Sequence, residues 1–189
     1  MNNRGIAAKT LACFLWMTIG MGTAHAQSVA PDNASAGLVA ITSVAAQNVG
    51  PITHLPLPRF VSMKARESNV RRGPSLTHRI DWIFKRQDMP LQIVAEHGHW
   101  RRVRDKDGMG GWVHYSLLSG SRTVLIENDA VELRMRPDDK AAVVAKLNSG
   151  VIARLGDCNA QWCRLRVASH RGWTRKTGLW GVAPDEIRN

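Results

Sequence analysis

Between residues 60 and 181 the chain consists of short runs in which apolar and polar residues alternate, separated by turn signals such as His97-Gly98 and Asn148-Ser149-Gly150. This period of two is typical of β-strands. The predicted strands are residues 60–63, 83–85, 91–95, 100–104 and 111–113, then 124–126, 143–146, 151–155, 162–167 and 172–174. About five short strands in roughly 60 residues favour a small, strongly bent antiparallel barrel.

The second half of this region repeats the first with a period near 62 residues. Val-Arg-Arg-Gly-Pro at 70–74 matches Leu-Arg-Met-Arg-Pro at 133–137, and Trp-Arg-Arg-Val-Arg at 100–104 matches Trp-Cys-Arg-Leu-Arg at 162–166. Gly111-Trp112 matches Gly172-Trp173, and Leu118 matches Leu179. Four anchors in register indicate an internal duplication. We therefore expect an all-β chain with two tandem domains, at residues 58–121 and 122–184.

Alternation within strands 100–104 and 162–167 predicts which side chains face the core. Val103 in the first strand and Leu165 in the second should point inward, so the residues of opposite parity should lie on the outer face. These outward residues are Trp100, Arg102, Arg104, Trp162, Arg164 and Arg166. An exposed Trp beside arginines offers an apolar platform together with forks that pair carboxylates. A bulge that turns the tryptophans inward, or a merely solvated arginine face, is the alternative.

The motifs resemble a known family. Ser68-Asn-Val-Arg-Arg-Gly-Pro-Ser75, the Trp-x-x-Val of Trp100 to Val103, and Gly111-Trp112-Val113 closely resemble the bacterial SH3-like domain; the second copy resembles it less fully, because Arg136 replaces Gly73. The resemblance implies two small SH3-like β-barrels, commonly non-catalytic modules of envelope proteins, several of which bind peptidoglycan. It also implies that Trp100 and Trp162 line ligand grooves. We expect Trp112 and Trp173 to close the barrels instead.

The N-terminus has the order of a secretory signal peptide. Arg4 and Lys9 precede an apolar stretch over residues 11–21, and Ala24-His25-Ala26 follows as a small-residue cleavage site. The apolar stretch is short for the alternative, a membrane anchor. Residues 1–26 are predicted to be removed after Ala26. Residues 27–57, rich in Ala, Ser and Pro, favour a flexible linker, with a short helix over 38–49 as the alternative.

Composition and charge then limit the partners. The 189 residues carry 26 Lys+Arg and 15 Asp+Glu, a net charge of +11. Because residues 1–26 hold two of the basic residues and no acid, the mature net charge is +9. A basic chain favours acidic partners, and export to the periplasm or cell exterior excludes nucleic acid among them. We expect a monomer without an integral membrane segment, with peptidoglycan or an envelope protein as partner.

Cys158 and Cys163 flank a short segment that reads as a hairpin tip, where opposed positions satisfy disulfide geometry. The matching residues of the first copy are Glu96 and Arg101, an expected cross-strand ion pair. This correspondence favours a structural disulfide over a catalytic thiol, which would need a histidine base.

The sequence gives little indication of a metal site. His97, His99 and His114 have no specific zinc spacing, and Asp105-Lys-Asp-Gly108 reads as a hairpin turn, since Ser116 stands where a calcium loop needs Glu. The sequence predicts no catalytic residue, no metal site and no cofactor. It favours a non-catalytic exported module that recognises peptidoglycan peptides, and a protein-interaction adaptor of the envelope is the alternative.

Overall fold

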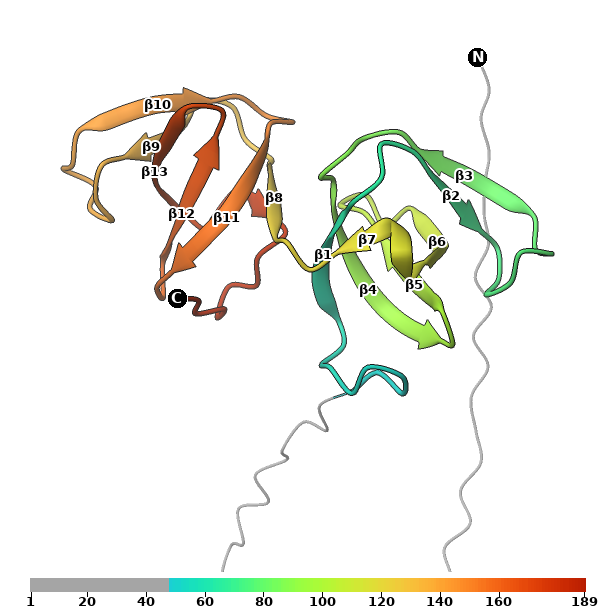
Figure 1. Ribbon diagram of the computed structural model, residues 1–189. Helices are drawn as coiled ribbons and strands as arrows, with labels where there is room; N and C mark the ends of the chain where they lie inside the picture. Colours follow the sequence, from blue (N-terminus) through green and yellow to red (C-terminus); the bar gives the residue numbers. More distant parts are fainter. Residues whose placement is uncertain (1–47) are drawn as a thin grey trace, which may run out of the picture. The chain divides into compact units, whose positions relative to one another are not determined.

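A computed structural model describes residues 48–189, and this part of the chain is all-β, in two copies of one seven-stranded antiparallel sheet (Figure 1). The first copy contains β1 (Arg59–Met63), β2 (Ser68–Arg71), β3 (Ile80–Phe84), β4 (Pro90–His97), β5 (Trp100–Arg104), β6 (Gly110–His114), the 3-10 turn η1 (Tyr115–Leu117) and β7 (Leu118–Ser119). The second contains β8 (Thr123–Ile126), β9 (Val131–Arg134), β10 (Val143–Leu147), β11 (Ile152–Cys158), β12 (Trp162–Val167), β13 (His170–Arg175) and β14 (Leu179–Trp180).

The strand order confirms the duplication. It is β3-β2-β6-β5-β4-β1-β7 in the first copy and β10-β9-β13-β12-β11-β8-β14 in the second, so each strand has its counterpart at the same place in the sheet. The expected number of about five strands per copy is too low. The pattern missed β2 and β9, which alternate over only four residues, and β7 and β14, which have two residues each.

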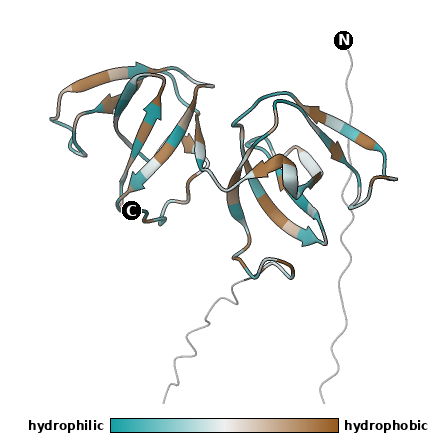
Figure 2. Ribbon diagram, viewed as in Figure 1, coloured by the Kyte–Doolittle hydropathy of each residue, from teal (hydrophilic) through white to brown (hydrophobic). Residues whose placement is uncertain are grey.

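Each copy has its own hydrophobic core, built from the inward positions of its strands. Apolar and polar stretches alternate along strands such as β11 and β12 (Figure 2). The first core contains Met63, Val70, Leu91, Ile93, Val103 and Val113. The second is larger and includes Val124, Ile126, Leu133, Ala153, Leu155, Cys158, Cys163, Leu165 and Leu179. No helix of residues 48–189 is long and apolar enough to cross a membrane.

The Gly-Trp motif of each copy has a steric reason. A Cβ on Gly111 would lie 2.6 Å from the carbonyl oxygen of Arg71, and one on Gly172 would lie 2.9 Å from that of Arg134. Both distances are shorter than real Cβ contacts, so only glycine lets β6 approach β2, and β13 approach β9, this closely.

Residues 48–57 correct the predicted linker boundary. They form a tight turn, with a bridge between Val49 and Pro56 and backbone hydrogen bonds from Gly50 N to Leu55 O (2.8 Å) and from Leu57 N to Asn48 O (2.6 Å). The turn is anchored on the barrel through Glu96, and Leu57 packs against the first core. The small residues and prolines of this segment predicted a flexible linker. Composition alone could not show that the carboxylate of Glu96, more than 40 residues away, accepts hydrogen bonds from its backbone. The signal peptide, residues 27–47 and most of the helix considered over 38–49 lie outside the described residues.

A segment after the second barrel covers the matching place in that copy. Arg188 pairs with Cys158 through two backbone hydrogen bonds, Cys158 N to Arg188 O (2.7 Å) and Arg188 N to Cys158 O (2.9 Å). Glu186 binds Arg122 across 2.9 Å. In both copies, therefore, the end of the longest strand, β4 or β11, is covered by residues from outside the repeat.

Candidate functional site

The first barrel has a groove of about 360 Å³ around Trp100. It is lined by residues of β2, the β2–β3 loop, β5, β6 and η1: Glu67, Asn69, Arg71, Leu76, Trp100, His114 and Leu117. Trp100 lies directly opposite His114 across the β5–β6 pair, and the two rings meet edge to face with centroids 5.6 Å apart. The Trp100 ring is only partly buried, as the alternation predicts, so it is accessible to a ligand.

Arg71 fixes one wall of this groove. Its Nη1 donates to the carbonyl oxygens of Leu76 (3.0 Å) and His78 (2.7 Å), which ties the β2–β3 loop to the sheet. Arg134, the matching residue of the second copy, donates to Ala141 O across 2.7 Å in the same way. The arginine of the repeated motif is thus a loop-holding residue in both copies. Sequence reasoning quoted it as part of the family motif without assigning this role.

Arg102 and Arg104 share the face of Trp100, since Val103 between them is buried, but they do not line its groove. Arg104 Nε donates to Gln92 Oε1 across 2.7 Å and borders a separate depression beside Leu57 and Pro58. Arg102 lies opposite Trp112. The cation that accompanies Trp100 in the groove is Arg71.

Trp162 corrects the expected exposure. It has the predicted parity, but its side chain lies under Arg175, whose guanidinium carbon is 4.7 Å from the ring centroid, and only 6% of the residue is exposed. The cause is its cross-strand neighbour: Trp162 pairs with the long side chain of Arg175, whereas Trp100 pairs with the shorter His114. Arg175 is held in turn by an ion pair with Asp139.

Trp112 and Trp173 were expected to close the barrels. Both are half-buried and alternate with the buried residues Val113 and Thr174, so they face outward. Trp173 pairs with Arg164 on the outer face of β12.

The predicted disulfide between Cys158 and Cys163 is present, with both residues almost fully buried. Its counterpart, the ion pair of Glu96 and Arg101, is also confirmed, with Arg101 Nε 3.5 Å from Glu96 Oε1. The bridge fits an oxidising, extracytoplasmic location.

Reducing the disulfide should lower the free energy of unfolding of the second barrel by about 2 kcal/mol, because the closed loop is short. Urea unfolding with and without dithiothreitol measures this, and amide exchange in β4 and β5 serves as the internal control. A loss of protection spread equally over both barrels would contradict a local staple.

Glu96 has partners that the sequence did not indicate. Its carboxylate accepts hydrogen bonds from Ile52 N (3.1 Å), Thr53 N (2.9 Å), Thr53 Oγ1 (2.7 Å) and Arg59 Nη2 (2.6 Å). Burial opposes ionisation of this carboxyl, but the hydrogen bonds from Thr53, Arg59 and Ile52 outweigh it and lower its pKa to about 2. Glu96 is therefore a buried, ionised anchor for the segment that precedes the barrel.

The remaining candidates have structural explanations. Asp105 Oδ1 accepts from Asp107 N (3.0 Å) and Met109 N (2.8 Å), which confirms a hairpin turn at the sequence that resembled a calcium loop. Within residues 48–189, no group of three or more His, Cys, Asp or Glu side chains is arranged to hold a metal ion.

A family model agrees with the fold. The family model described as bacterial SH3 domain matches residues 64–120 and 127–181, more than half of the chain. Among solved structures, the chain is similar to NlpC2 of Trichomonas vaginalis (11% identity, TM-score 0.31, 66% of this chain and 48% of that one) and to NlpC1 of the same organism (13%, 0.31, 66% and 46%). It thus spans less than half the length of either structure. A search of curated proteins finds no match. The chain belongs to the bacterial SH3 domain family and carries two tandem copies of the domain.

Proposed function

We propose that this protein is a non-catalytic binding module, exported to the periplasm or cell exterior after cleavage behind Ala26, which holds peptidoglycan peptides in the Trp100 groove of the first barrel. The observation that carries the proposal is the groove itself: an accessible indole whose surrounding wall is fixed by Arg71. Bacterial SH3 domains are typically binding modules, and the basic chain suits an acidic ligand.

The groove offers the contacts that a short peptide needs. Trp100 and Leu117 supply apolar surface, while Arg71 and Glu67 supply opposite charges. Arg71 uses Nη1 to hold the loop, and among residues 48–189 its Nη2 makes no hydrogen bond, so this arm of the fork is available to a carboxylate. Peptidoglycan stem peptides carry such carboxylates on short aliphatic chains.

A second candidate function, an envelope adaptor, is favoured by a different observation. Strand β3 lies at the edge of the first sheet and exposes Ile80, Trp82 and Ile83 by 40% or more. An apolar edge strand of this kind can accept a strand from a partner protein. Trp82 lies outside the Trp100 groove, so the two functions depend on different tryptophans.

Two matched variants separate these functions. Trp100→Ala is expected to lower retention of the protein on purified peptidoglycan sacculi about tenfold, because the indole platform is lost, while Trp82→Ala leaves retention unchanged. Co-sedimentation measures retention, and circular dichroism checks the fold. Equal retention of Trp100→Ala and the unaltered protein would refute the assignment of the groove. Loss of a crosslinked envelope polypeptide in Trp82→Ala alone would support the adaptor instead.

The roles expected for Trp162, Arg102, Arg104, Arg164 and Arg166 as ligand contacts stay predictions. The geometry favours Trp100 over Trp162, because Arg175 covers the second ring. Arg164 and Arg166 belong to a different cluster of side chains on the second barrel.

A further inference from the structure

The outer face of the second barrel carries three arginines in one row across three neighbouring strands. Arg154 of β11 lies directly opposite Arg166 of β12, and Arg166 lies directly opposite Arg171 of β13. Neighbouring strands are about 4.8 Å apart, so three guanidinium stems leave the sheet within about 10 Å. We call Arg154, Arg166 and Arg171 the arginine row.

The arginine row borders a defined groove. Arg164, two residues before Arg166 and on the same face of β12, joins the row in lining a depression of about 240 Å³. The strand register between β11 and β12 shifts between Leu155 and Cys158, and Gly156 at this shift adds no side chain to the groove. The arginines therefore surround an open space.

The positive charge of this groove is poorly compensated within residues 48–189. There, Arg154, Arg166 and Arg171 have no carboxylate within 4.0 Å, and the one ion pair in the groove joins Arg164 to Asp157 at 3.4 Å. Three other arginines of the same barrel are paired, Arg122 with Glu186, Arg134 with Glu132 and Arg175 with Asp139, whereas Arg136 and Arg188 have no ion pair among the described residues. Like charges directly opposite each other destabilise a sheet, and a bound anion would relieve that repulsion.

The chemistry of the groove favours a phosphate. A guanidinium donates a planar fork of N–H groups that matches phosphate oxygens, and a phosphate monoester carries up to two negative charges on three oxygens, enough to bridge several forks. The groove is smaller than the usual 300–1,000 Å³ of pockets for drug-sized ligands, so it suits one or two phosphoryl groups.

We propose that Arg154, Arg164, Arg166 and Arg171 form a binding site for a phosphate monoester or diphosphate group. This site is on the second barrel and does not depend on the peptide groove of the first. Sequence reasoning singled out Arg164 and Arg166 as carboxylate partners beside Trp162. The strand register instead associates them with Arg154 and Arg171, and Trp162 does not line the groove.

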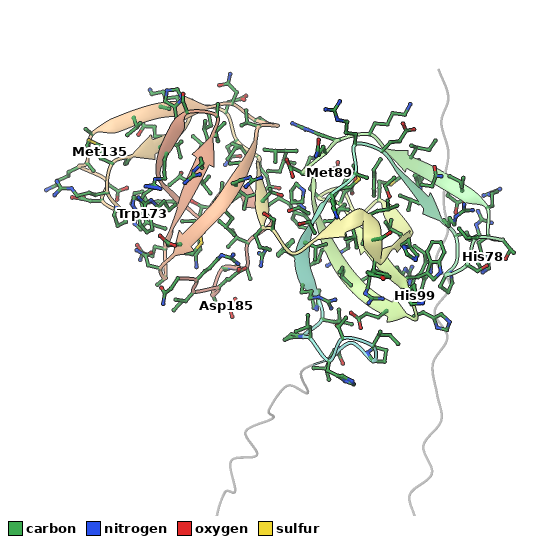
Figure 3. All side chains as sticks on the ribbon, viewed as in Figure 1. His78, Met89, His99, Met135, Trp173 and Asp185 are labelled. Atoms are coloured by element: carbon green, nitrogen blue, oxygen red, sulfur yellow. A yellow bond between two sulfur atoms is a disulfide. The ribbon has the colours of Figure 1, made fainter. Side chains whose placement is uncertain are left out.

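Titration of the unaltered protein with inorganic pyrophosphate tests the site. Binding can be followed by calorimetry and by the intrinsic tryptophan fluorescence of the protein, to which Trp173 contributes; this residue pairs with Arg164 and is labelled in Figure 3. The double variant Arg154→Gln/Arg171→Gln, which changes two exposed residues, is expected to weaken binding about tenfold or more. The control Arg72→Gln/Arg79→Gln removes the same charge from the first barrel, where both arginines pair with Asp81, and should bind as the unaltered protein does.

Vesicles identify the source of the phosphate. Vesicles containing phosphatidic acid that bind the protein, and release it on addition of pyrophosphate, would indicate a lipid headgroup; binding of pyrophosphate without binding of vesicles would indicate a soluble phosphate compound. Either result supports the site. Equal weakening in both double variants would show a general charge effect and overturn the proposal, as would the absence of pyrophosphate binding at millimolar concentration.

Discussion

Glu96→Ala is expected to lower the free energy of unfolding of the first barrel by about 3 kcal/mol, because it leaves the buried Arg101 and the half-buried Arg59 without a counter-charge. The change also removes the acceptor for the amides of Ile52 and Thr53, so residues 48–57 should lose their anchor. Urea unfolding of the full chain measures the stability, and amide exchange at Ile52 and Thr53 reports the release of the segment.

The same carboxylate predicts a dependence on pH. The pKa of Glu96 is lowered from its ordinary value of 4.5 to about 2, so its contribution to stability is fully present above pH 4.5 and is lost as the pH falls towards 2. Glu96→Gln retains the shape of the side chain without the charge, and should flatten this part of the stability profile of the first barrel.

A control variant separates burial from charge. Asp107→Ala removes an exposed carboxylate of the same barrel, which pairs with Lys106 on the surface, and should change the stability by less than about 0.5 kcal/mol. If Glu96→Ala and Asp107→Ala had equal effects, the anchor described for Glu96 would be wrong.

Trp162→Ala is expected to destabilise the second barrel by about 3 kcal/mol, since a nearly fully buried indole is lost together with its contact to Arg175. Retention of the Trp162→Ala protein on sacculi should fall only in proportion to the fraction of protein that is unfolded, because Trp162 is not part of the Trp100 groove. Thermal unfolding, followed by near-ultraviolet circular dichroism, measures the loss.

Trp100→Ala provides the matched comparison in the first barrel. Its ring occupies the same position in the repeat but is partly exposed, so the loss of stability should be clearly smaller. A specific loss of binding in Trp162→Ala at full stability would reverse the roles given to the two tryptophans.

Much of the fold could be predicted from short-range pattern. The anchors around Arg71, Trp100 and Gly111 repeat at nearly constant offsets, and the alternation around Val103 and Leu165 places side chains on the correct faces. Glu96 and Arg101 also pair across their hairpin as Cys158 and Cys163 do in the second copy. This match could be predicted because the two partners of a hairpin tip are close in sequence. Local spacing carries this information directly.

The errors concern contacts that depend on strand register or on distant segments. The burial of Trp162 depends on Arg175, the residue opposite it on β13. Which residue lies opposite is set by the length of the β12–β13 turn, and the sequence does not give that length. The arginine row was missed for the same reason. Alternation can place Arg154, Arg166 and Arg171 on the outer face, but only the strand register shows that they lie directly opposite one another. The docking of residues 48–57 needs an acceptor more than 40 positions away.

Because segments outside the repeat cover β4 and β11, the unit that was duplicated is smaller than the complete folded unit. The unit that was duplicated extends from β1 to β7 and from β8 to β14, but each copy is completed by residues beyond these strands, around Thr53 in one case and Arg188 in the other. The two completing segments come from opposite sides of the repeat and use different chemistry, a carboxylate anchor and a backbone bridge. A domain exchange cut at the repeat boundaries would therefore transfer the first barrel without residues 48–57 and the second barrel without the segment around Arg188.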